Sequence, residues 1–207
     1  MKLIIQIPCL NEELTLPETL KDLPKSLNGI DDIEVLVIDD GSTDRTVEVA
    51  KEHGVRHVLS LTNNKGLAKA FIYGINHALH LGADIIVNTD ADNQYFGGDI
   101  AKLIQPILRK RADIVIGDRQ VETIPHFSTF KILLQKLGSW TVQQLSGTTI
   151  PDATSGFRAY SKEAALQMNV ISDFTYTVET IISAGKKNIA IEHTPVRTNK
   201  KLRESRL

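Results

Sequence analysis

Residues 85–94 read Ile85-Ile86-Val87-Asn88-Thr89-Asp90-Ala91-Asp92-Asn93-Gln94. A short β-branched run that ends in carboxylates predicts a buried strand. In open α/β sheets ligands bind at the carboxyl ends of the strands, so this strand would deliver its acids to a binding edge. Residues two apart in an extended segment share a face, so Asp90, Asp92 and Gln94 can point together. Their hard oxygen atoms suit Mg²⁺ or Mn²⁺ on a diphosphate, which predicts an enzyme with a nucleotide-activated substrate.

Acids at a strand end also have a simpler explanation, because such residues often form only a solvated turn. A calcium EF-hand is excluded: counted from Asp90, position six is Tyr95 instead of glycine and position twelve is Ala101 instead of glutamate. A second acidic strand end, Asp39-Asp40, lies upstream. Two such ends in one domain favour a binding site.

Strands and helices are predicted to alternate through the first half of the chain. Apolar runs predict strands at residues 3–8, 33–39, 56–59, 85–89 and 114–117. Helices are predicted between them at residues 12–27, 44–53, 67–81 and 99–109, with Asn11 as the N-cap of the first. This alternation implies an α/β fold, a mostly parallel sheet flanked by helices on both faces.

The second half of the chain is less regular. A helix is predicted at residues 127–145, a strand at 152–160, a helix from Ser161 and a last strand at 189–196. The first of these helices carries an apolar stripe made of Phe130, Leu133, Leu134, Leu137, Trp140 and Leu145. Core packing and a membrane surface both explain such a stripe, and core packing is favoured.

Composition and charge exclude several classes of protein. The 207 residues suffice for one domain with a sizeable core. A formal net charge of -1 gives no argument for nucleic acid as a partner. The single cysteine, Cys9, excludes an intrachain disulfide, fits a reducing compartment and is expected to be a small buried filler. No secretory signal is visible and no apolar stretch approaches the ~18 residues that span a bilayer, so a soluble or peripheral chain is expected.

Glycine-rich phosphate cradles are absent, because the first strand leads into residues 8–13, Pro-Cys-Leu-Asn-Glu-Glu. A diphosphate would therefore depend more strongly on a metal ion. Asp39 suits a base N–H or a ribose hydroxyl. Lys65, next to the start of the 67–81 helix, favours an anion, although a turn and cap explain it equally well. Arg119 can pair with a phosphate or with a carboxylate of the metal site.

Several motifs follow one another over nearly the whole chain. They are residues 7–13, Val37-Ile38-Asp39-Asp40-Gly41-Ser42-Thr43-Asp44, Asn64-Lys65-Gly66 with Ala70 and Gly74, and Asp90-Ala91-Asp92-Asn93-Gln94. Together they resemble family 2 glycosyltransferases of the GT-A fold, a Rossmann-like α/β sheet with a short antiparallel portion on the acceptor side. Gly117-Asp118-Arg119 and residues 152–160, which include Ser155-Gly156-Phe157-Arg158-Ala159, resemble the dolichyl-phosphate mannose synthase branch and related polyprenyl-phosphate glycosyltransferases.

The resemblance implies roles for the matching residues. Nucleotide-sugar binding is implied for Pro8, Asn11, Glu12, Asp39, Lys65, Asp90, Ala91 and Asp92. Ligation of Mg²⁺ or Mn²⁺ is implied for Asp90, Asp92 and Gln94, with Asp92 contacting the ion most directly. Catalytic roles are implied for Asp92, Arg119 and Arg158, the two arginines through phosphate binding or active-site architecture. Contacts to the acceptor or its phosphate are implied for Arg197, Lys201, Arg203 and Arg206.

The implied reaction is inverting, metal-dependent transfer of a sugar from GDP-mannose or a UDP-sugar to a polyprenyl or dolichyl phosphate at the cytoplasmic membrane face. Residues 1–196 would form the catalytic domain, with a nucleotide-sugar half at 1–119 and an acceptor half at 120–196. Residues 197–207 would form a basic juxtamembrane tail. Many relatives carry C-terminal membrane helices, so a cytoplasmic protein that is peripheral, or anchored through a segment outside this chain, is expected. The donor base, acceptor lipid and oligomeric state stay open.

Three other functions fit part of the pattern. A family 2 enzyme acting on a saccharide hydroxyl would need a general base, for which Asp152 and Glu179 are candidates. Glu179 is expected instead to pair with Arg158 or a nearby lysine, and the Gln-x-x-Arg-Trp motif of polysaccharide synthases is absent at Trp140. A sugar-nucleotide pyrophosphorylase would need a glycine-rich loop after the first strand. A degenerate nucleotide-sugar-binding module is disfavoured because its acidic ligands are intact.

Overall fold

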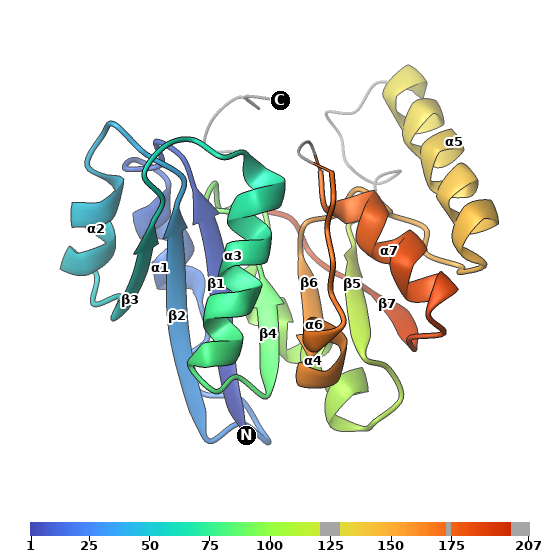
Figure 1. Cartoon of the computed structure of the whole chain (residues 1–207), viewed down its shortest axis with the longest axis horizontal. Coiled ribbons are helices and arrows are strands. Elements are labelled where there is room, and N and C mark those ends of the chain that lie inside the picture. The colour runs from blue at the N-terminus through green and yellow to red at the C-terminus, as the bar shows by residue number, and fades with distance from the viewer. Residues whose placement is uncertain (121–128, 173–174, 200–207) are drawn as a thin grey trace.

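A seven-stranded sheet forms the centre of the molecule (Figure 1). The computed structural model describes residues 1–120, 129–172 and 175–199. The strands follow the spatial order β3-β2-β1-β4-β6-β5-β7. Their bounds are β1 Lys2–Cys9, β2 Asp32–Asp39, β3 His57–Ser60, β4 Ile85–Asn88, β5 Ile114–Asp118, β6 Arg158–Ser161 and β7 Ile191–Pro195.

All of these strands except β6 run in the same direction. β1 pairs in parallel with β2 and β4, and β2 pairs in parallel with β3. β6 is antiparallel to both β4 and β5, whereas β5 and β7 are parallel. This arrangement confirms the predicted mostly parallel α/β sheet with a short antiparallel portion. It also means that the carboxyl ends of the parallel strands and the amino end of β6 lie along one edge, the upper edge in Figure 1.

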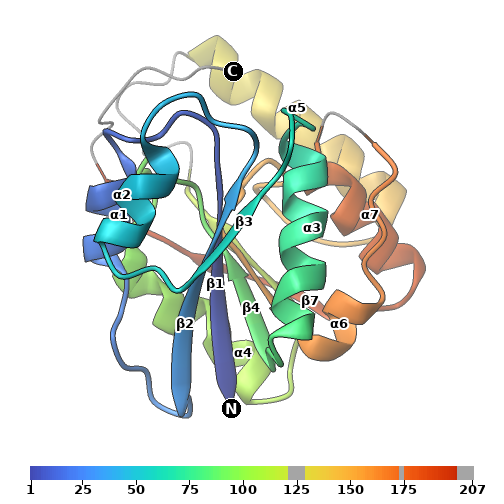
Figure 2. The ribbon, with the colours of Figure 1, turned by 60° about the vertical axis from the view of Figure 1, so that its left-hand side comes forward.

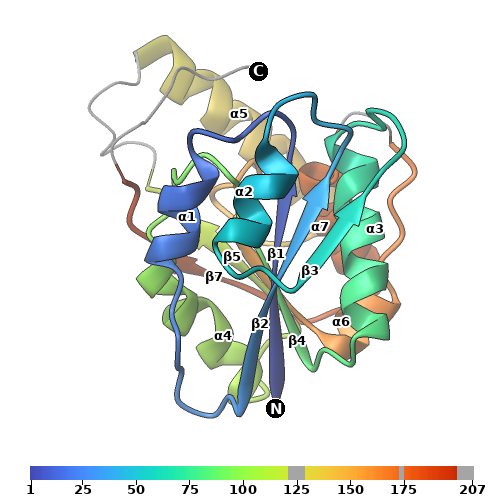
Figure 3. The same cartoon turned by 90° about the vertical axis from the view of Figure 1, so that its left-hand side faces the viewer.

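Helices cover both faces of the sheet (Figures 2 and 3). The helices are α1 Leu16–Asp22, α2 Thr46–Glu52, α3 Leu67–His80, the 3₁₀ turn η1 Gly97–Asp99, α4 Ile100–Leu108, α5 Thr129–Ser146, α6 Lys162–Leu166 and α7 Thr177–Lys186. Successive side chains of β1 point to opposite faces. Leu3 and Ile5 pack in one core cluster with residues of α1, α2 and α4, and Ile4 packs in the other with residues of α3, α5, α6 and α7. Cys9 is buried in the first cluster, as predicted.

Some predicted elements differ from the structure in extent. The predicted 12–27 helix is reduced to α1, and Asn11 does not cap it, because Asn11 Oδ1 accepts the backbone N–H of Thr43 at 2.8 Å instead. The predicted 152–160 strand is reduced to β6, because the residues before it form a loop. Helix α7 is missing from the predicted elements. Its core side includes Ile181 and Ala184 but also Thr177 and Thr180, which weakens its apolar pattern.

The apolar stripe of α5 lies on the molecular surface. Its described members Leu133, Leu134, Leu137, Trp140 and Leu145 are 62%, 51%, 56%, 56% and 59% exposed. The core side of this helix instead carries Val142, which packs near α7 and the sheet. The preference for core packing of the stripe is therefore wrong for these five side chains. None of the helices in the described ranges is both long and apolar enough to span a bilayer.

Candidate functional site

The shared edge of the sheet collects residues that are far apart in the sequence. They are Asn11 and Glu12 after β1, Asp39 at the end of β2, Asp90 and Asp92 after β4, Arg119 after β5, Arg158 at the start of β6 and Arg197 after β7. Parallel strands separated by crossover helices must bring their carboxyl ends to one side. The topology thus gathers most of the predicted site residues, and Lys201, Arg203 and Arg206 lie outside the described residues.

One wall of this edge is formed by the loops after β1 and β2. Asn11 N donates to Ser42 Oγ at 2.9 Å, and Asn11 Oδ1 accepts the backbone N–H of Thr43 at 2.8 Å. Asp39 Oδ1 accepts the backbone N–H of Ser42 at 2.9 Å. Asn11 has a φ of 55°, a left-handed conformation that asparagine tolerates better than most residues. These hydrogen bonds hold the two loops together, and Asn11 and Asp39 both take part in them.

Pro8 and Glu12 are buried in the same region. Pro8 pairs with Ile38 in the β1–β2 ladder. Glu12 N donates to Thr46 Oγ1 at 2.8 Å, and its carboxylate accepts the hydroxyl of Thr15 at 2.5 Å. Glu12 is only 8% exposed, so its bonds to Thr46 and Thr15 help to hold this wall in place and little of its side chain reaches the surface.

Asp40 organises the loop that leads into α3. Its two carboxylate oxygens accept the backbone N–H groups of Lys65 at 2.7 Å and Gly66 at 2.9 Å. Gly66 has a φ of 89°, which a residue with a side chain adopts only with strain. Asp40 is buried, whereas the Lys65 side chain remains exposed. The sequence interpretation assigned ligand character to Asp39 and did not identify this clamp, because its partners lie 25 residues or more away.

The loop after β4 carries the predicted metal ligands. Asp92 Oδ1 accepts the backbone N–H of Gln94 at 3.1 Å, and Asn93 between them has a φ of 55°. The Asp90 carboxylate lies against Gly156: a Cβ atom there would be 2.9 Å from Asp90 Oδ1. Only glycine fits beside this carboxylate without displacing it.

The electrostatics of this loop favour a bound cation. Burial and repulsion by Asp92 raise the pKa of Asp90 to about 7, although the charges of Arg119 and Arg158 oppose the rise. A divalent cation would relieve this repulsion between the two carboxylates. The described residues contain no group of three or more His, Cys, Asp or Glu side chains placed to hold a metal ion. A cation held by the Asp90 and Asp92 carboxylates would take most of its ligands from water and from phosphate oxygens, as Mg²⁺ commonly does.

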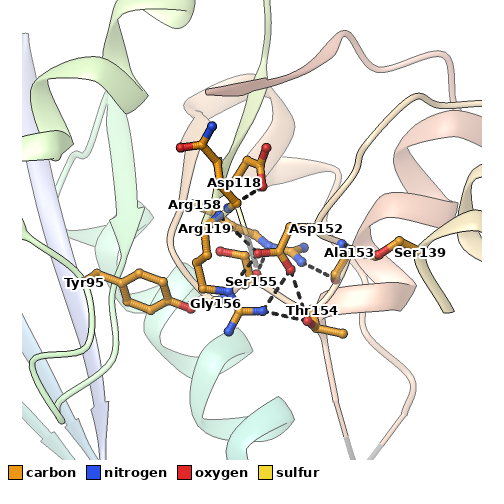
Figure 4. Close-up of polar contacts among 11 residues, drawn as sticks. Tyr95, Asp118, Arg119, Ser139, Asp152, Ala153, Thr154, Ser155, Gly156 and Arg158 are labelled. Carbon is orange, nitrogen blue, oxygen red and sulfur yellow. Dashed lines mark hydrogen bonds and ion pairs between the residues drawn. The ribbon is translucent and has the colours of Figure 1, made fainter. Parts of the chain in front are cut away.

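Arg119 forms the opposite side of the site with Asp152 (Figure 4). Its guanidinium makes two parallel bonds to the Asp152 carboxylate, 2.7 Å from Nε and 2.8 Å from Nη2, and a third to Thr154 Oγ1 at 2.8 Å. Both side chains are largely buried, at 9% and 4% exposed. Burial alone would raise the pKa of Asp152, but the Arg119 guanidinium outweighs burial and holds it below its usual range. The pair fixes the direction of Arg119 and keeps Asp152 ionised.

Arg158 is fully buried under the loop that precedes β6. It donates to the carbonyl oxygens of Ser155 at 2.7 Å, Ala153 at 2.9 Å and Thr177 at 2.8 Å, and to Thr180 Oγ1 at 2.7 Å. These contacts join the 153–156 loop to the start of α7. Of the two roles that the resemblance implies, phosphate binding and architecture, this bonding favours architecture.

The two candidate bases have other partners in this structure. Asp152 is held by Arg119 as described. The Glu179 carboxylate accepts the backbone N–H groups of Ile171 at 2.7 Å and Ser172 at 3.0 Å. The predicted pairing of Glu179 with Arg158 is wrong, because Arg158 bonds to carbonyl and hydroxyl oxygens instead.

Arg197 lies directly beyond β7, near the loop after β4. Its guanidinium bonds to the fully buried carboxylate of Asp99 at 2.7 Å and stacks over the ring of Phe96 at 4.0 Å. Burial opposes ionisation of Asp99, but hydrogen bonds from Arg197 and Lys102 outweigh it and lower the Asp99 pKa to about 2. Arg197 is therefore engaged by a protein carboxylate.

Comparison with known sequences gives a consistent family. The family model described as "Glycosyl transferase family 2" matches residues 4–167. The chain is 31% identical to the UDP-N-acetylglucosamine–dolichyl-phosphate N-acetylglucosaminyltransferase of Methanococcus voltae, over 93% of this chain and 83% of that protein. It is 30% identical to the undecaprenyl-phosphate mannosyltransferase of Micrococcus luteus, over 85% of this chain and 74% of that protein.

Comparison with solved structures supports the same fold. Glucosyl-3-phosphoglycerate synthase from Mycobacterium tuberculosis, in complex with Mn²⁺, UDP and phosphoglyceric acid, matches 99% of this chain and 72% of its own. The TM-score is 0.77 and the sequence identity is 18%. At this identity the likeness concerns the fold alone.

Proposed function

The chain belongs to the family 2 glycosyltransferases, and on that premise we propose that it transfers a sugar, with inversion, from a nucleoside diphosphate sugar to a polyprenyl or dolichyl phosphate. The observation that carries this proposal is the edge where the Asp90–Asp92 carboxylate pair lies between the Asn11–Asp39 wall and the Arg119–Asp152 pair. GDP-mannose and UDP-sugars are the two candidate donor classes.

The donor half of the site would be built from residues 1–119. Asn11, Glu12 and Asp39, with Pro8 beneath them, would bind the nucleoside, because their loops are locked together and present polar groups at the sheet edge. Lys65 would reach the donor phosphates from a backbone position that Asp40 fixes. Ala91 would border the diphosphate through its backbone, which is held in place because its carbonyl oxygen accepts the Thr19 hydroxyl at 2.9 Å.

Asp90, Asp92 and Gln94 would hold Mg²⁺ or Mn²⁺ against the diphosphate. When bound, the ion neutralises negative charge on the leaving nucleoside diphosphate. Asp90 suits this role because its half-buried carboxylate lies beside Gly156, where an added Cβ atom would be only 2.9 Å from Oδ1. The Arg119 N–H groups that do not bond to Asp152 or Thr154 would donate to the phosphate as negative charge develops on it. The bonds to Asp152 would keep the guanidinium in this orientation.

The acceptor is better explained as a phosphate than as a saccharide hydroxyl. A hydroxyl would need a general base, and the two candidates, Asp152 and Glu179, are held by Arg119 and by backbone N–H groups. A phosphate is already anionic and needs positioning and desolvation instead of deprotonation. The two relatives named above carry a lipid phosphate in their names, which supports this choice. The acceptor half would be residues 120–196.

The exposed stripe of α5 would rest on the membrane that contains the acceptor lipid. Five large apolar side chains on one helix face water in this structure, and in Figure 1 the helix extends above the sheet edge that carries the site. A helix of this kind binds a membrane surface through its buried apolar area. We propose a cytoplasmic location peripheral to this membrane, with residues 197–207 as a basic juxtamembrane tail.

Vesicle binding tests this membrane surface. We expect the double variant Leu137→Ser, Trp140→Ser to lose about tenfold in affinity for phosphatidylcholine–phosphatidylglycerol vesicles, because two half-exposed apolar side chains are removed. Leu166→Ser is the matched control, since Leu166 is 65% exposed on α6 at the other end of the sheet. Equal binding of the double variant and the wild type would contradict the proposal.

Calorimetry tests the donor site. We expect either UDP or GDP to bind with Mn²⁺ or Mg²⁺ present, and binding of that nucleotide to be lost with a chelator. The nucleotide that binds identifies the donor base. If neither nucleotide binds with either metal, the proposed function is wrong. Formation of a sugar-linked polyprenyl phosphate by the wild type would in turn exclude a degenerate binding module.

A further inference from the structure

Residues 197–199, which we call the strap, pair with the chain directly after the metal-ligand candidates. The backbone N–H of Phe96 donates to Arg197 O at 3.2 Å, and that of Asn199 donates to Gln94 O at 2.8 Å. Between them Tyr95 and Thr198 form an antiparallel bridge. Segments about a hundred positions apart thus share a short ladder next to Asp92.

The side chain of Asn199 reaches both sides of this ladder. Its Nδ2 lies 3.2 Å from Asn93 Oδ1, 3.3 Å from the carbonyl oxygen of Tyr95 and 3.3 Å from Asp22 Oδ2 at the end of α1. Asp22 Oδ2 also accepts the backbone N–H of Gly97 at 2.7 Å. One carboxamide therefore contacts Asn93 and Tyr95 of the chain after β4, and Asp22 at the end of α1. We call residues 90–94, which carry the candidate metal ligands, the metal-binding loop.

The other end of the strap is fixed by Arg197. The backbone N–H of Arg197 donates to Asp99 Oδ2 at 2.7 Å, and its guanidinium bonds to Asp99 Oδ1 at 2.7 Å. Asp99 belongs to η1 and is fully buried. A buried carboxylate that is bonded by both the backbone and the side chain of one residue holds that residue firmly.

We propose that the strap positions the metal-binding loop, and that Asn199 is a positioning residue for the cation. This inference rests on the proposed function. Gln94 is held on both sides: its backbone N–H donates to Asp92 Oδ1, and its carbonyl accepts the N–H of Asn199. The strap thereby fixes the direction of the Asp92 carboxylate before an ion arrives. Groups that orient metal ligands in this way contribute to metal affinity without touching the ion.

Mn²⁺ binding, followed by electron paramagnetic resonance with and without the nucleotide that the wild type accepts, tests the inference. We expect Asn199→Ala to weaken Mn²⁺ affinity about tenfold, as is typical for groups that orient ligands. Thr198→Ala is the matched control in the same strap, because Thr198 uses its backbone in the bridge. An affinity of Asn199→Ala equal to that of Thr198→Ala would overturn the inference.

A second pair of variants tests the anchor. Arg197→Ala should also weaken Mn²⁺ binding, whereas Arg111→Ala should not, since Arg111 pairs with Glu192 near the other end of β7 at 3.2 Å. If either strap variant fails to fold, amide hydrogen exchange on the wild type replaces it. We expect the Phe96 and Asn199 amides to exchange more slowly with Mn²⁺ and nucleotide bound, and unchanged exchange would overturn the inference. A wild type that binds neither Mn²⁺ nor Mg²⁺, with either nucleotide, would contradict the proposed function itself.

Discussion

Asp92→Asn is expected to lower the rate of sugar transfer by about 10³-fold or more, which corresponds to about 4 kcal/mol of transition-state stabilisation. The change removes one of two carboxylates that would hold the cation but keeps the size of the side chain. The nucleoside wall around Asn11 and Asp39 is untouched. In calorimetry, Asp92→Asn with Mn²⁺ or Mg²⁺ present should therefore bind nucleotide no more tightly than the wild type does with a chelator.

The fold of the Asp92→Asn variant should remain intact. Asp92 is half-exposed, and its carboxylate accepts the backbone N–H of Gln94, a bond that an amide oxygen can also accept. Asp32→Asn is the matched control, because Asp32 is an exposed acid at the opposite edge of the same sheet. Turnover of Asp92→Asn within tenfold of the control would contradict the metal-based mechanism.

The sequence alone predicted that candidate site residues from several strands share one edge of the sheet. Asp39, Asp90 and Arg119 each follow an apolar run, and strand ends are visible in the sequence as a change from β-branched to polar residues. Parallel topology then brings those ends together without further information. The fold class follows from the same local signals, whereas the family was predicted from the resemblance of the ordered motifs.

The partners of these residues could not be predicted in the same way. The pairing of Arg119 with Asp152 and the contact of Asn199 with Asn93 join distant segments, so no local spacing reveals them. A contact between distant segments also explains why α1 begins later than predicted. Asn11 bonds to the loop after β2 and does not cap the helix. Periodicity likewise showed that α5 has an apolar side, but not whether another element covers it.

Arg158 shows most clearly how tertiary context decides a role. The sequence placed it with Arg119 as a phosphate or architectural residue, and the two arginines differ sharply in surroundings. Arg119 has a carboxylate partner, whereas Arg158 is a fully buried cation whose bonds go to three carbonyl oxygens and one hydroxyl. It stacks near the ring of Tyr176, 5.8 Å from the ring centroid. Its removal should therefore affect folding first.

Arg158→Met is expected to lower the free energy of unfolding by about 3–5 kcal/mol. The substitution keeps an apolar stem of similar length but leaves buried acceptors without donors, among them the carbonyl oxygens of Ala153 and Ser155. Urea unfolding followed by circular dichroism measures the change. The free energy of unfolding of Arg158→Lys should lie between those of Arg158→Met and the wild type, because lysine keeps the charge but loses most of the hydrogen bonds.

Arg111→Met is the control for Arg158→Met, because Arg111 is an exposed arginine whose ion pair should contribute little to stability. Folded Arg158→Met, isolated at low temperature, should also bind Mn²⁺ less tightly. The 153–156 loop carries Gly156, against which the Asp90 carboxylate rests, so a displaced loop would shift that ligand. A loss of stability below 1 kcal/mol would show that the buried bonds of Arg158 are replaceable, and unchanged Mn²⁺ affinity would show that the loop does not support Asp90.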